Sequence, residues 1–325
     1  MSKLRVPCAE RNGRFLAFYR SALFKIGRVA PYFIFLGIAT PSAAQEIALT
    51  FDDAPTGHSE FQSGAARTTE LIKKLREVNV SQVAFFVVTS RVDSMGKLRL
   101  KRYAEAGHII ANHTHSHARI DRIGIDNYID DIFKADAILR SLPGFKPWLR
   151  FPYLDEGRTL AHRDALRKAL TENGYFNGYV TVDNYDWYLN RLFRTAVAEK
   201  KEINWDKLRS LYIDHLWKSI QFYDRLARET LGRSPKHVLL LHENDLAALF
   251  ITDLVQFIRG KGWTIISPVE AYRDPIATAI PNVLLNNQGR VAALAREKGY
   301  SDRLSLESES TEFLDTVVRK ERIFR

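Results

Sequence analysis

The sequence predicts an α/β protein built on parallel strands, either a barrel of β/α units or an open doubly wound sheet. From Glu46 onward, short runs rich in β-branched and aromatic residues alternate with longer segments of helical periodicity. Strands that follow one another through a helix pair in parallel by right-handed crossovers. The strand runs are apolar without alternation, as expected where both faces of a sheet are buried.

Seven apolar runs are predicted as strands: 47–51, 83–88, 109–111, 148–151, 179–182, 238–241 and 263–266. Apolar positions three or four apart predict helices between them: Leu71, Leu75 and Val78; Ile129, Ile132 and Phe133; Leu166 and Leu170; Leu254, Phe257 and Ile258. The interval 188–236 is too long for one crossover, and its periodicity predicts a helical insertion with one long helix. Residues 276–325 end in a short amphipathic pattern, and we expect them to pack on the domain as a C-terminal helical extension.

Residues 1–44 have the order of a secretory signal peptide. Seven basic residues and one acid precede the apolar run 30–39, and small residues follow at Ser42 and Ala44. We predict cleavage after Ala44, a catalytic domain over 45–275, and export to the periplasm or the extracellular space. Two alternatives remain: a membrane anchor, which needs roughly 20 apolar residues, and a mitochondrial transit peptide, which is usually richer in serine.

The composition excludes several classes of protein. With 325 residues, 46% hydrophobic and 26% charged, the chain is neither disordered, nor a coiled coil, nor a polytopic membrane protein. Its net charge is +10, but without residues 1–44 it is +4, so no nucleic-acid partner is indicated. The single cysteine, Cys8, would leave with the signal, which excludes disulfides and thiolate chemistry from the mature chain.

Side chains capable of catalysis lie at the carboxyl ends of five predicted strands, where active sites of parallel β/α folds form. In chain order these are Asp52 and Asp53; His113, His115 and His117; Arg150, Pro152 and Tyr153; Asp183, Asp186 and Trp187; and His242. His113 and His117 with one carboxylate make the ligand set of an open metal site, which would lower the pKa of a bound water. The other carboxylate could pair with Arg150, and His242 could donate a proton near neutral pH.

Each feature taken alone has an ordinary structural explanation. Two histidines four residues apart occur by chance, and paired aspartates after a strand often form a turn. Arg150 could cover the end of a barrel, Trp187 could belong to the core, and His242 could be a satisfied core histidine. Their joint occurrence at five strand ends favours an active site.

Five short motifs carry a resemblance to a known family. They are residues 50–53, 113–117, 150–153, 183–187 and 239–242. In this order they resemble the motifs of the polysaccharide deacetylase family, carbohydrate esterase family four, which includes chitooligosaccharide and peptidoglycan N-acetylglucosamine deacetylases. The match covers roughly residues 46–272. The chain departs from the family pattern at Ala54 and Leu154, where glycine is common, and at Glu243, where aspartate is frequent.

The resemblance implies a distorted (β/α) barrel of about seven parallel strands and assigns roles to the motif residues. The general base would be Asp52, oriented by Arg150, and the general acid would be His242, held by Asp186. The metal ligands would be Asp53, His113 and His117. The backbone N–H of Tyr153 would bind the oxyanion. The pocket for the acetyl group would be walled by Trp187, Leu239 and Leu241. The metal would be divalent, usually Zn²⁺, with Co²⁺, Mn²⁺ or Ni²⁺ as alternatives.

The sequence thus predicts a metal-dependent hydrolase that removes N-acetyl groups from N-acetylhexosamine units of a peptidoglycan or chitin-like polysaccharide and releases acetate. The expected partner is the acetylated glycan, with no nucleic acid and no stable membrane insertion after signal cleavage. An O-acetyl esterase acting on xylan would use the same residues. A non-catalytic glycan-binding module would keep the aromatic residues but not need an acid and a base, and a metallophosphoesterase would need more ligands for two metals.

Overall fold

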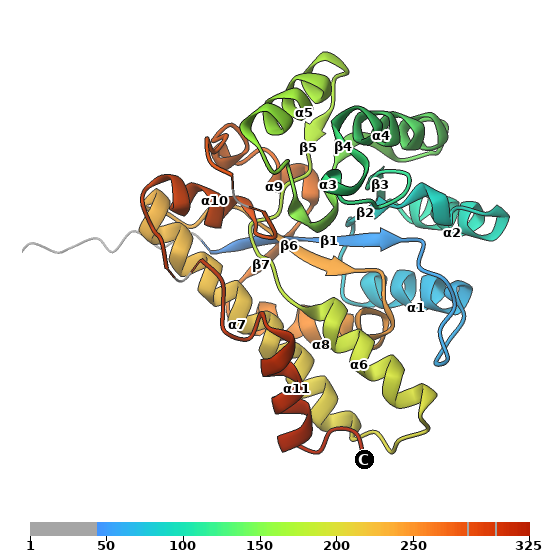
Figure 1. Ribbon diagram of the computed structural model, residues 1–325. Coiled ribbons are helices and arrows are strands. Elements are labelled where there is room, and N and C mark those ends of the chain that lie inside the picture. Colours follow the sequence, from blue (N-terminus) through green and yellow to red (C-terminus); the bar gives the residue numbers. More distant parts are fainter. Residues whose placement is uncertain (1–43, 285, 303) are drawn as a thin grey trace, which may run out of the picture. The chain divides into compact units, whose positions relative to one another are not determined.

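A computed structural model describes residues 44–284, 286–302 and 304–325. The predicted signal segment lies outside these residues, apart from Ala44. Seven strands of the described chain form one parallel sheet (Figure 1). They are β1 (Glu46–Ala54), β2 (Ala84–Val87), β3 (Ile109–Asn112), β4 (Phe145–Leu149), β5 (Phe176–Asn177), β6 (His237–His242) and β7 (Thr264–Ile266).

The strand order is β5-β4-β3-β2-β1-β6, and β7 pairs with the first residues of β1. The two edges of this path approach each other, because a parallel bridge joins Val182, in the segment after β5, to Leu239 of β6. The sheet therefore curves into an incomplete barrel. This arrangement confirms the predicted distorted (β/α) barrel with parallel strands.

The helices occupy the intervals between the strands. Their bounds are α1 Gly64–Glu77, α2 Ser94–Glu105, α3 Ile120–Ile123, α4 Ile125–Leu139, α5 Leu160–Glu172, α6 Asp186–Ala198, α7 Trp205–Leu231, α8 Asp245–Gly260, α9 Pro268–Ala271, α10 Arg290–Glu297 and α11 Thr311–Lys320. Three 3-10 turns are η1 Thr89–Arg91, η2 Pro152–Leu154 and η3 Pro275–Ala277. In Figure 1, α1, α2, α4 and α5 follow one another around the outside of the sheet. None of the helices in the described residues is both long and apolar enough to span a bilayer.

Two strand predictions need correction. The fourth strand is Phe145–Leu149, so Arg150 lies beyond its end and not within it. The run 179–182, predicted as the fifth strand, is not a strand, and the short β5 precedes it. The carbonyl oxygens of Tyr179 and Val180 accept hydrogen bonds from Tyr272 Oη and Arg290 N, in the chain after β7. Only Val182 pairs with a strand, through its single bridge to Leu239 of β6, so the run does not form a ladder, although its side chains are as buried as those of a strand.

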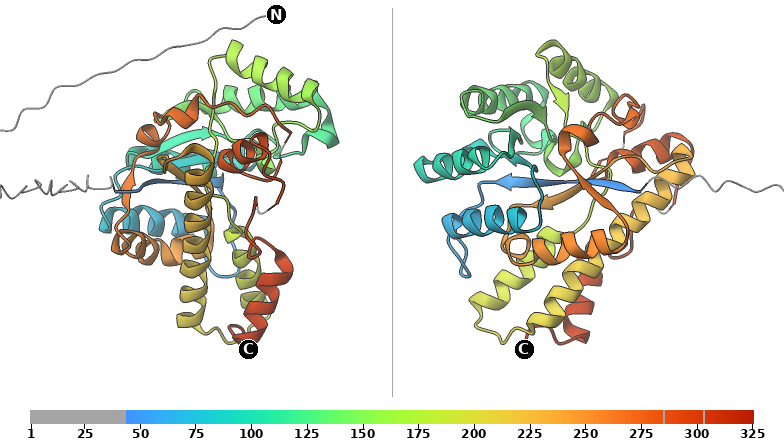
Figure 2. Two further views of the ribbon diagram at one scale, coloured as in Figure 1. Left: turned by 90° about the vertical axis from the view of Figure 1, so that its left-hand side faces the viewer. Right: turned by 180° about the vertical axis from the view of Figure 1, so that it is seen from behind.

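The interval predicted as an insertion contains α6 and the long helix α7. Side chains of α7 at the predicted apolar positions are buried, among them Leu208, Tyr212 and Leu216. Asn204 caps its start by accepting from Lys207 N, and Gly232 ends it in the left-handed conformation that glycine adopts readily (φ 73°). Helix α11 lies beside α7 in all three views (Figures 1 and 2).

Candidate active site

The end of β1 places the two adjacent aspartates next to the end of β6. Asp52 and His242 are register partners in the parallel ladder, and Glu243 N donates to Asp52 O at 2.9 Å. The next residue, Asp53, has a positive φ of 70°, and its side chain lines the same cavity as that of Asp52. The strand pairing thus brings a carboxylate pair and an imidazole together at one rim of the sheet.

Three side chains form a group able to hold a metal ion: Asp53, His113 and His117. One ligand atom from each lies within 4.8 Å of the others. His113 Nδ1 lies 2.7 Å from the carbonyl oxygen of Arg150, which fixes the proton on Nδ1 and leaves Nε2 free to coordinate. Burial lowers the pKa of both histidines, so both rings are neutral at pH 7, as metal ligands must be.

The carboxylate of Asp53 also fits a cation. Its Oδ1 has no hydrogen bond among the described residues, although Arg91 Nη1 lies 3.2 Å and His117 Nε2 lies 3.4 Å away. Burial alone would raise the pKa of Asp53, but the protonated His242, the neighbouring imidazoles of His117 and His113, and Arg91 outweigh it and lower the pKa to about 2. An ionised carboxylate with a free oxygen, beside two neutral imidazoles, is the donor set of an open divalent site.

The second carboxylate, Asp52, is buried and held by Arg150. Arg150 Nη1 donates to Asp52 Oδ1 at 2.8 Å, and its Nη2 lies 3.2 Å from both Thr50 Oγ1 and Tyr272 Oη. Its Nε donates to the carbonyl oxygen of Gly178. Burial raises the pKa of Asp52 to about 6, against the opposing charge of Arg150. Asp52 therefore has the fixed position and the pKa near neutrality that suit a general base.

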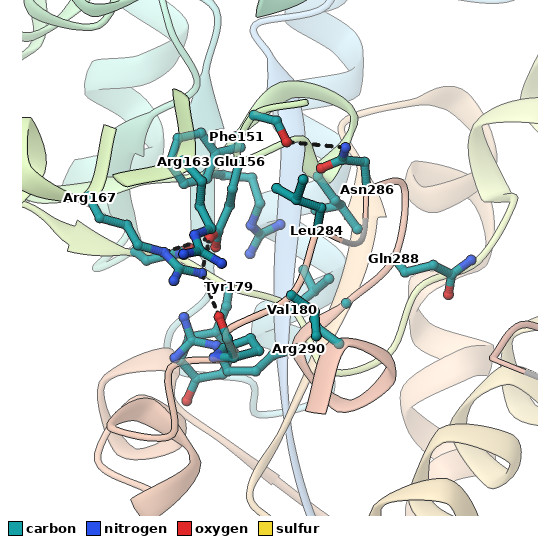
Figure 3. Close-up of a pocket in the computed structure, with 18 residues that line it drawn as sticks. Phe151, Glu156, Arg163, Arg167, Tyr179, Val180, Leu284, Asn286, Gln288 and Arg290 are labelled. Atoms are coloured by element: carbon teal, nitrogen blue, oxygen red, sulfur yellow. Dashed lines mark hydrogen bonds and ion pairs between the residues drawn. The ribbon is translucent and has the colours of Figure 1, made fainter. Parts of the chain in front are cut away.

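Arg150 also lines another cavity, of about 50 Å³, together with side chains that Figure 3 labels, among them Phe151 and Arg163. Its lining includes none of the predicted metal ligands. Arg167 Nη2 donates there to Glu156 Oε2 at 2.7 Å and to Pro281 O at 3.0 Å, and Arg290 lies 4.0 Å above the Tyr179 ring. These contacts tie the C-terminal segment to α5 and to the segment after β5, and so support the side of the site that carries Arg150.

His242 is held by a buried carboxylate on α6. Its Nδ1 lies 2.6 Å from Asp186 Oδ1, and its backbone N–H donates to Asp186 Oδ2 at 3.0 Å. Asn244 Nδ2 donates to the same Oδ2 at 3.0 Å. Burial by itself lowers the pKa of His242, but Asp186 outweighs it and, with the other nearby carboxylates, raises the pKa to about 9. The imidazole therefore keeps its proton at neutral pH, and Nε2 faces the cavity.

The cavity around these groups has a volume of about 490 Å³. Trp187 and Tyr153 line it, each 39% exposed, and Arg119 stacks 3.8 Å above the Tyr153 ring. The prediction that Leu239 and Leu241 wall it is wrong: both are fully buried in the core, and Leu240 lines the cavity instead. Side chains alternate between the two faces of a strand, so the wall and the core positions are one residue apart.

Backbone strain is concentrated at this site. Four non-glycine residues with positive φ belong to the motif segments, Asp53, Thr114, His117 and Tyr153, and a fifth, Leu154, directly follows one of them. At Leu154 the positive φ of 50° accounts for the glycine that is common there in the family pattern, since glycine adopts this conformation without steric cost. The strain is maintained by local bonds; for example, Thr114 N donates to Asn112 Oδ1 at 2.7 Å, and Thr114 Oγ1 accepts from His117 N at 3.0 Å. Such residues cluster at sites where side-chain direction matters more than stability.

Glu243 is a structural residue of the site whose role the sequence did not reveal. Its fully buried carboxylate accepts from Arg99 Nη2 at 2.7 Å, Tyr103 Oη at 3.0 Å and Thr56 N at 2.6 Å. It therefore joins the end of β6 to α2 and to the loop after β1. An acid that follows a run of buried leucines is itself expected to be buried, and a buried charge needs a partner. The position of Glu243 after Leu239–Leu241 and His242 therefore indicated a structural contact.

Comparison with known proteins follows the same segments. Residues 39–176 match the family model described as polysaccharide deacetylase. A peptidoglycan-N-acetylglucosamine deacetylase of Bacillus cereus is 34% identical over 148 residues, which are 45% of this chain and 48% of that protein. A chitin deacetylase of Arthroderma benhamiae is 26% identical over 148 residues, covering 43% of this chain and 35% of that protein. The chain thus spans about half the length of the first of these relatives and less of the second.

A solved polysaccharide deacetylase of Bacillus cereus superposes with a TM-score of 0.50 at 18% identity. The superposition covers 69% of this chain and 91% of that one. At this identity the likeness concerns the fold.

The donor set predicts one divalent ion per chain. Replacing Asp53 by Asn or His117 by Gln removes a ligand, and we expect Zn²⁺ affinity measured by calorimetry to fall at least about 100-fold. The matched control is His115→Gln, because the His115 Nδ1 contacts Thr89 Oγ1 and the side chain is outside the ligand group. Wild-type affinity in the Asp53→Asn protein would exclude this site.

The buried carboxylate predicts a large loss of stability on removal of its charge. Glu243→Gln leaves Arg99 buried without its ionic partner, and we expect the free energy of unfolding to fall by about 3–5 kcal/mol in urea denaturation. Glu77→Gln, which removes an exposed pair with Lys73, should change it by less than about 0.5 kcal/mol. Equal stability of the two variants would show that the Glu243 contacts do not hold the site together.

Proposed function

We propose that this chain, which belongs through residues 39–176 to the polysaccharide deacetylase family, is a metal-dependent N-deacetylase. It would remove acetyl groups from N-acetylhexosamine units of a peptidoglycan or chitin-like polysaccharide and release acetate. The observation that carries the proposal is the convergence of three groups on one cavity: the ligand set Asp53, His113 and His117, the buried carboxylate Asp52, and the protonated imidazole His242.

Asp53, His113 and His117 would hold the metal. Two imidazole nitrogens and one carboxylate oxygen, with a position left open, suit Zn²⁺ best, with Co²⁺, Mn²⁺ or Ni²⁺ as alternatives. A divalent cation there supplies a Lewis acid that polarises the acetyl carbonyl and lowers the pKa of water.

Asp52 would act as the base. Its Oδ1 is engaged by Arg150, so Oδ2, which lies 3.7 Å from His113 Nε2, faces the ligand group. This oxygen would accept the proton of the attacking water as the new C–O bond forms. Since the pKa of Asp52 is about 6, the carboxylate is mostly ionised at neutral pH and still basic enough to take a proton.

His242 would act as the acid. Cleavage of an amide C–N bond expels an amine, which must be protonated to leave. His242 Nε2 would supply that proton, while Asp186 holds Nδ1 and stabilises the imidazolium. The products are acetate and a free amine on the sugar. An amine leaving group depends on this protonation more than the alcohol of an O-acetyl ester does.

Acetate release from N-acetylglucosamine oligomers, peptidoglycan glycan and acetylxylan, with chelator and metal add-back, tests this function. We expect metal-dependent release from the N-acetylated glycans, and a fall in kcat of about 10²–10⁴ in Asp52→Asn and in His242→Gln. The control is Asp206→Asn, at a position 88% exposed on α7. A fully active Asp52→Asn enzyme would overturn the mechanism, release from acetylxylan alone would indicate the esterase, and binding without release would indicate a glycan-binding module.

We also propose that the protein acts outside the cytoplasm. The support is the charged, apolar and small-residue order of residues 1–44. N-terminal sequencing of the exported protein should begin at Gln45, and an exported chain that retains Phe35 would contradict cleavage at this position.

A further inference from the structure

The catalytic groups lie at the junction of two cavities. The first is the 490 Å³ cavity described above, and the second, of about 460 Å³, runs along α6. Asp53, Trp187 and His242 line both. A glycan whose reacting sugar lies over the catalytic groups would therefore place a neighbouring sugar in the second cavity, which we call the α6 arm. Trp187 offers an exposed ring at the boundary, on which a sugar can stack.

The α6 arm has a positive wall. Arg191 and Arg194 both line it, and residues three apart share one face of a helix. The one acid of the arm besides Asp53 is Glu60, whose Oε2 lies 3.3 Å from Arg194 Nη2. Among the described residues, no ion pair links Arg191 to an acid, and Arg194 Nε is buried without a hydrogen bond. The arm therefore contains more guanidinium donors than its own acid can satisfy.

These arginines are fixed relative to the reacting groups. Helix α6 begins at Asp186, which holds His242, so Arg191 follows it by less than two turns on the same rigid element. The intervening Asn190 accepts from the backbone N–H groups of Asp245 and Leu246 at 3.1 and 3.2 Å. This contact fastens the middle of α6 to the start of α8. A ligand group that binds the arginines would therefore also set the position of the sugar at the catalytic groups.

From these observations we infer that the α6 arm binds a carboxylate carried by the sugar next to the one that is deacetylated. The inference rests on the proposed function and names its substrate class, an acidic glycan. A guanidinium presents two parallel N–H donors that match the two oxygens of a carboxylate. A phosphate dianion would be opposed by Glu60 and Asp53 more strongly than a carboxylate, and a neutral glycan would offer the two guanidinium groups no charge to pair with.

The carboxylate could belong to a lactic acid ether, as in N-acetylmuramic acid, or to a uronic acid. The experiment therefore compares three matched oligomers with the full-length, metal-loaded protein: one with lactyl carboxylates, the same with its carboxylates converted to methylamides, and one with uronic acid neighbours. The measured quantity is the ratio of kcat/KM for each carboxylate oligomer to that for the methylamide. We expect the wild type to prefer one carboxylate source, which identifies it.

In the double variant Arg191→Gln/Arg194→Gln we expect that ratio to fall about tenfold or more, since hydrogen bonds between charged groups are lost. The fall should appear in KM, because the contact is remote from the reacting atoms. Glu60→Gln should raise the preference by removing the competing acid. The control is Arg225→Gln on α7, an exposed arginine that lines neither cavity. No preference in the wild type, or a preference that survives in the double variant, would overturn the inference while leaving the proposed function intact.

Equilibrium binding distinguishes failure of the proposed deacetylase function from failure of the inference that the α6 arm binds a carboxylate. The same oligomers are titrated into the metal-free full-length protein, with tryptophan fluorescence as the readout. If no oligomer yields acetate, the proposed function fails, and tighter binding of the carboxylate oligomer that depends on Arg191 and Arg194 would still support the acidic-glycan arm. Equal binding of carboxylate and methylamide oligomers would reject it.

Discussion

Glu243 imposes the constraint on which the geometry of the site depends. Its backbone N–H donates to Asp52 O, and its buried carboxylate accepts from Thr56 N and Arg99. Glu243 thus holds the chain at two points, Asp52 and Thr56. The candidate base Asp52 and the metal ligand Asp53 belong to the segment between these points. A shift of β6 relative to β1 would break both bonds and leave a buried charge unpaired, which costs several kcal/mol. The distance between base and acid is therefore set by the pairing of β1 with β6.

The side chains of Asp52 and His242 are each held by a buried partner, Arg150 and Asp186. Each partner makes several further hydrogen bonds. Arg150 donates hydrogen bonds to Asp52, to Gly178 and to hydroxyl groups, and Asp186 accepts three hydrogen bonds, two from His242 and one from Asn244. Such saturated partners have little freedom to move when a substrate binds, so the site does not need to reorganise during the reaction. The positive φ angles near the ligands agree with this, since strain persists only where many bonds fix the backbone.

The sequence predicted the parallel strands and the site because strand ends in this fold class converge whatever the details of packing. Prediction from the sequence failed where contacts between distant parts of the chain determine the local structure. Residues 179–182 have the composition of a strand, but the carbonyl groups of Tyr179 and Val180 bond to residues after β7, and only Val182 bridges to β6. The family resemblance implies that Leu239 and Leu241 wall the pocket, yet Leu240 faces it; a run of four apolar residues does not show which of its side chains face the cavity. The partners of Glu243 lie more than 130 positions away and could not be read locally.

Charge counts alone could not separate structural arginines from those that face a ligand. The net charge of +4 after residue 44 describes a nearly balanced chain, and several of its arginines are buried with complete sets of acceptors. Arg150 and Arg99 belong to this group, and their charge is cancelled within the fold. Arg191 and Arg194 both line the α6 arm, and among the described residues only Arg194 has an acid partner there, Glu60. The unmet hydrogen-bonding capacity of a fixed arginine, and not its charge, therefore indicates where an external anion gains most by binding.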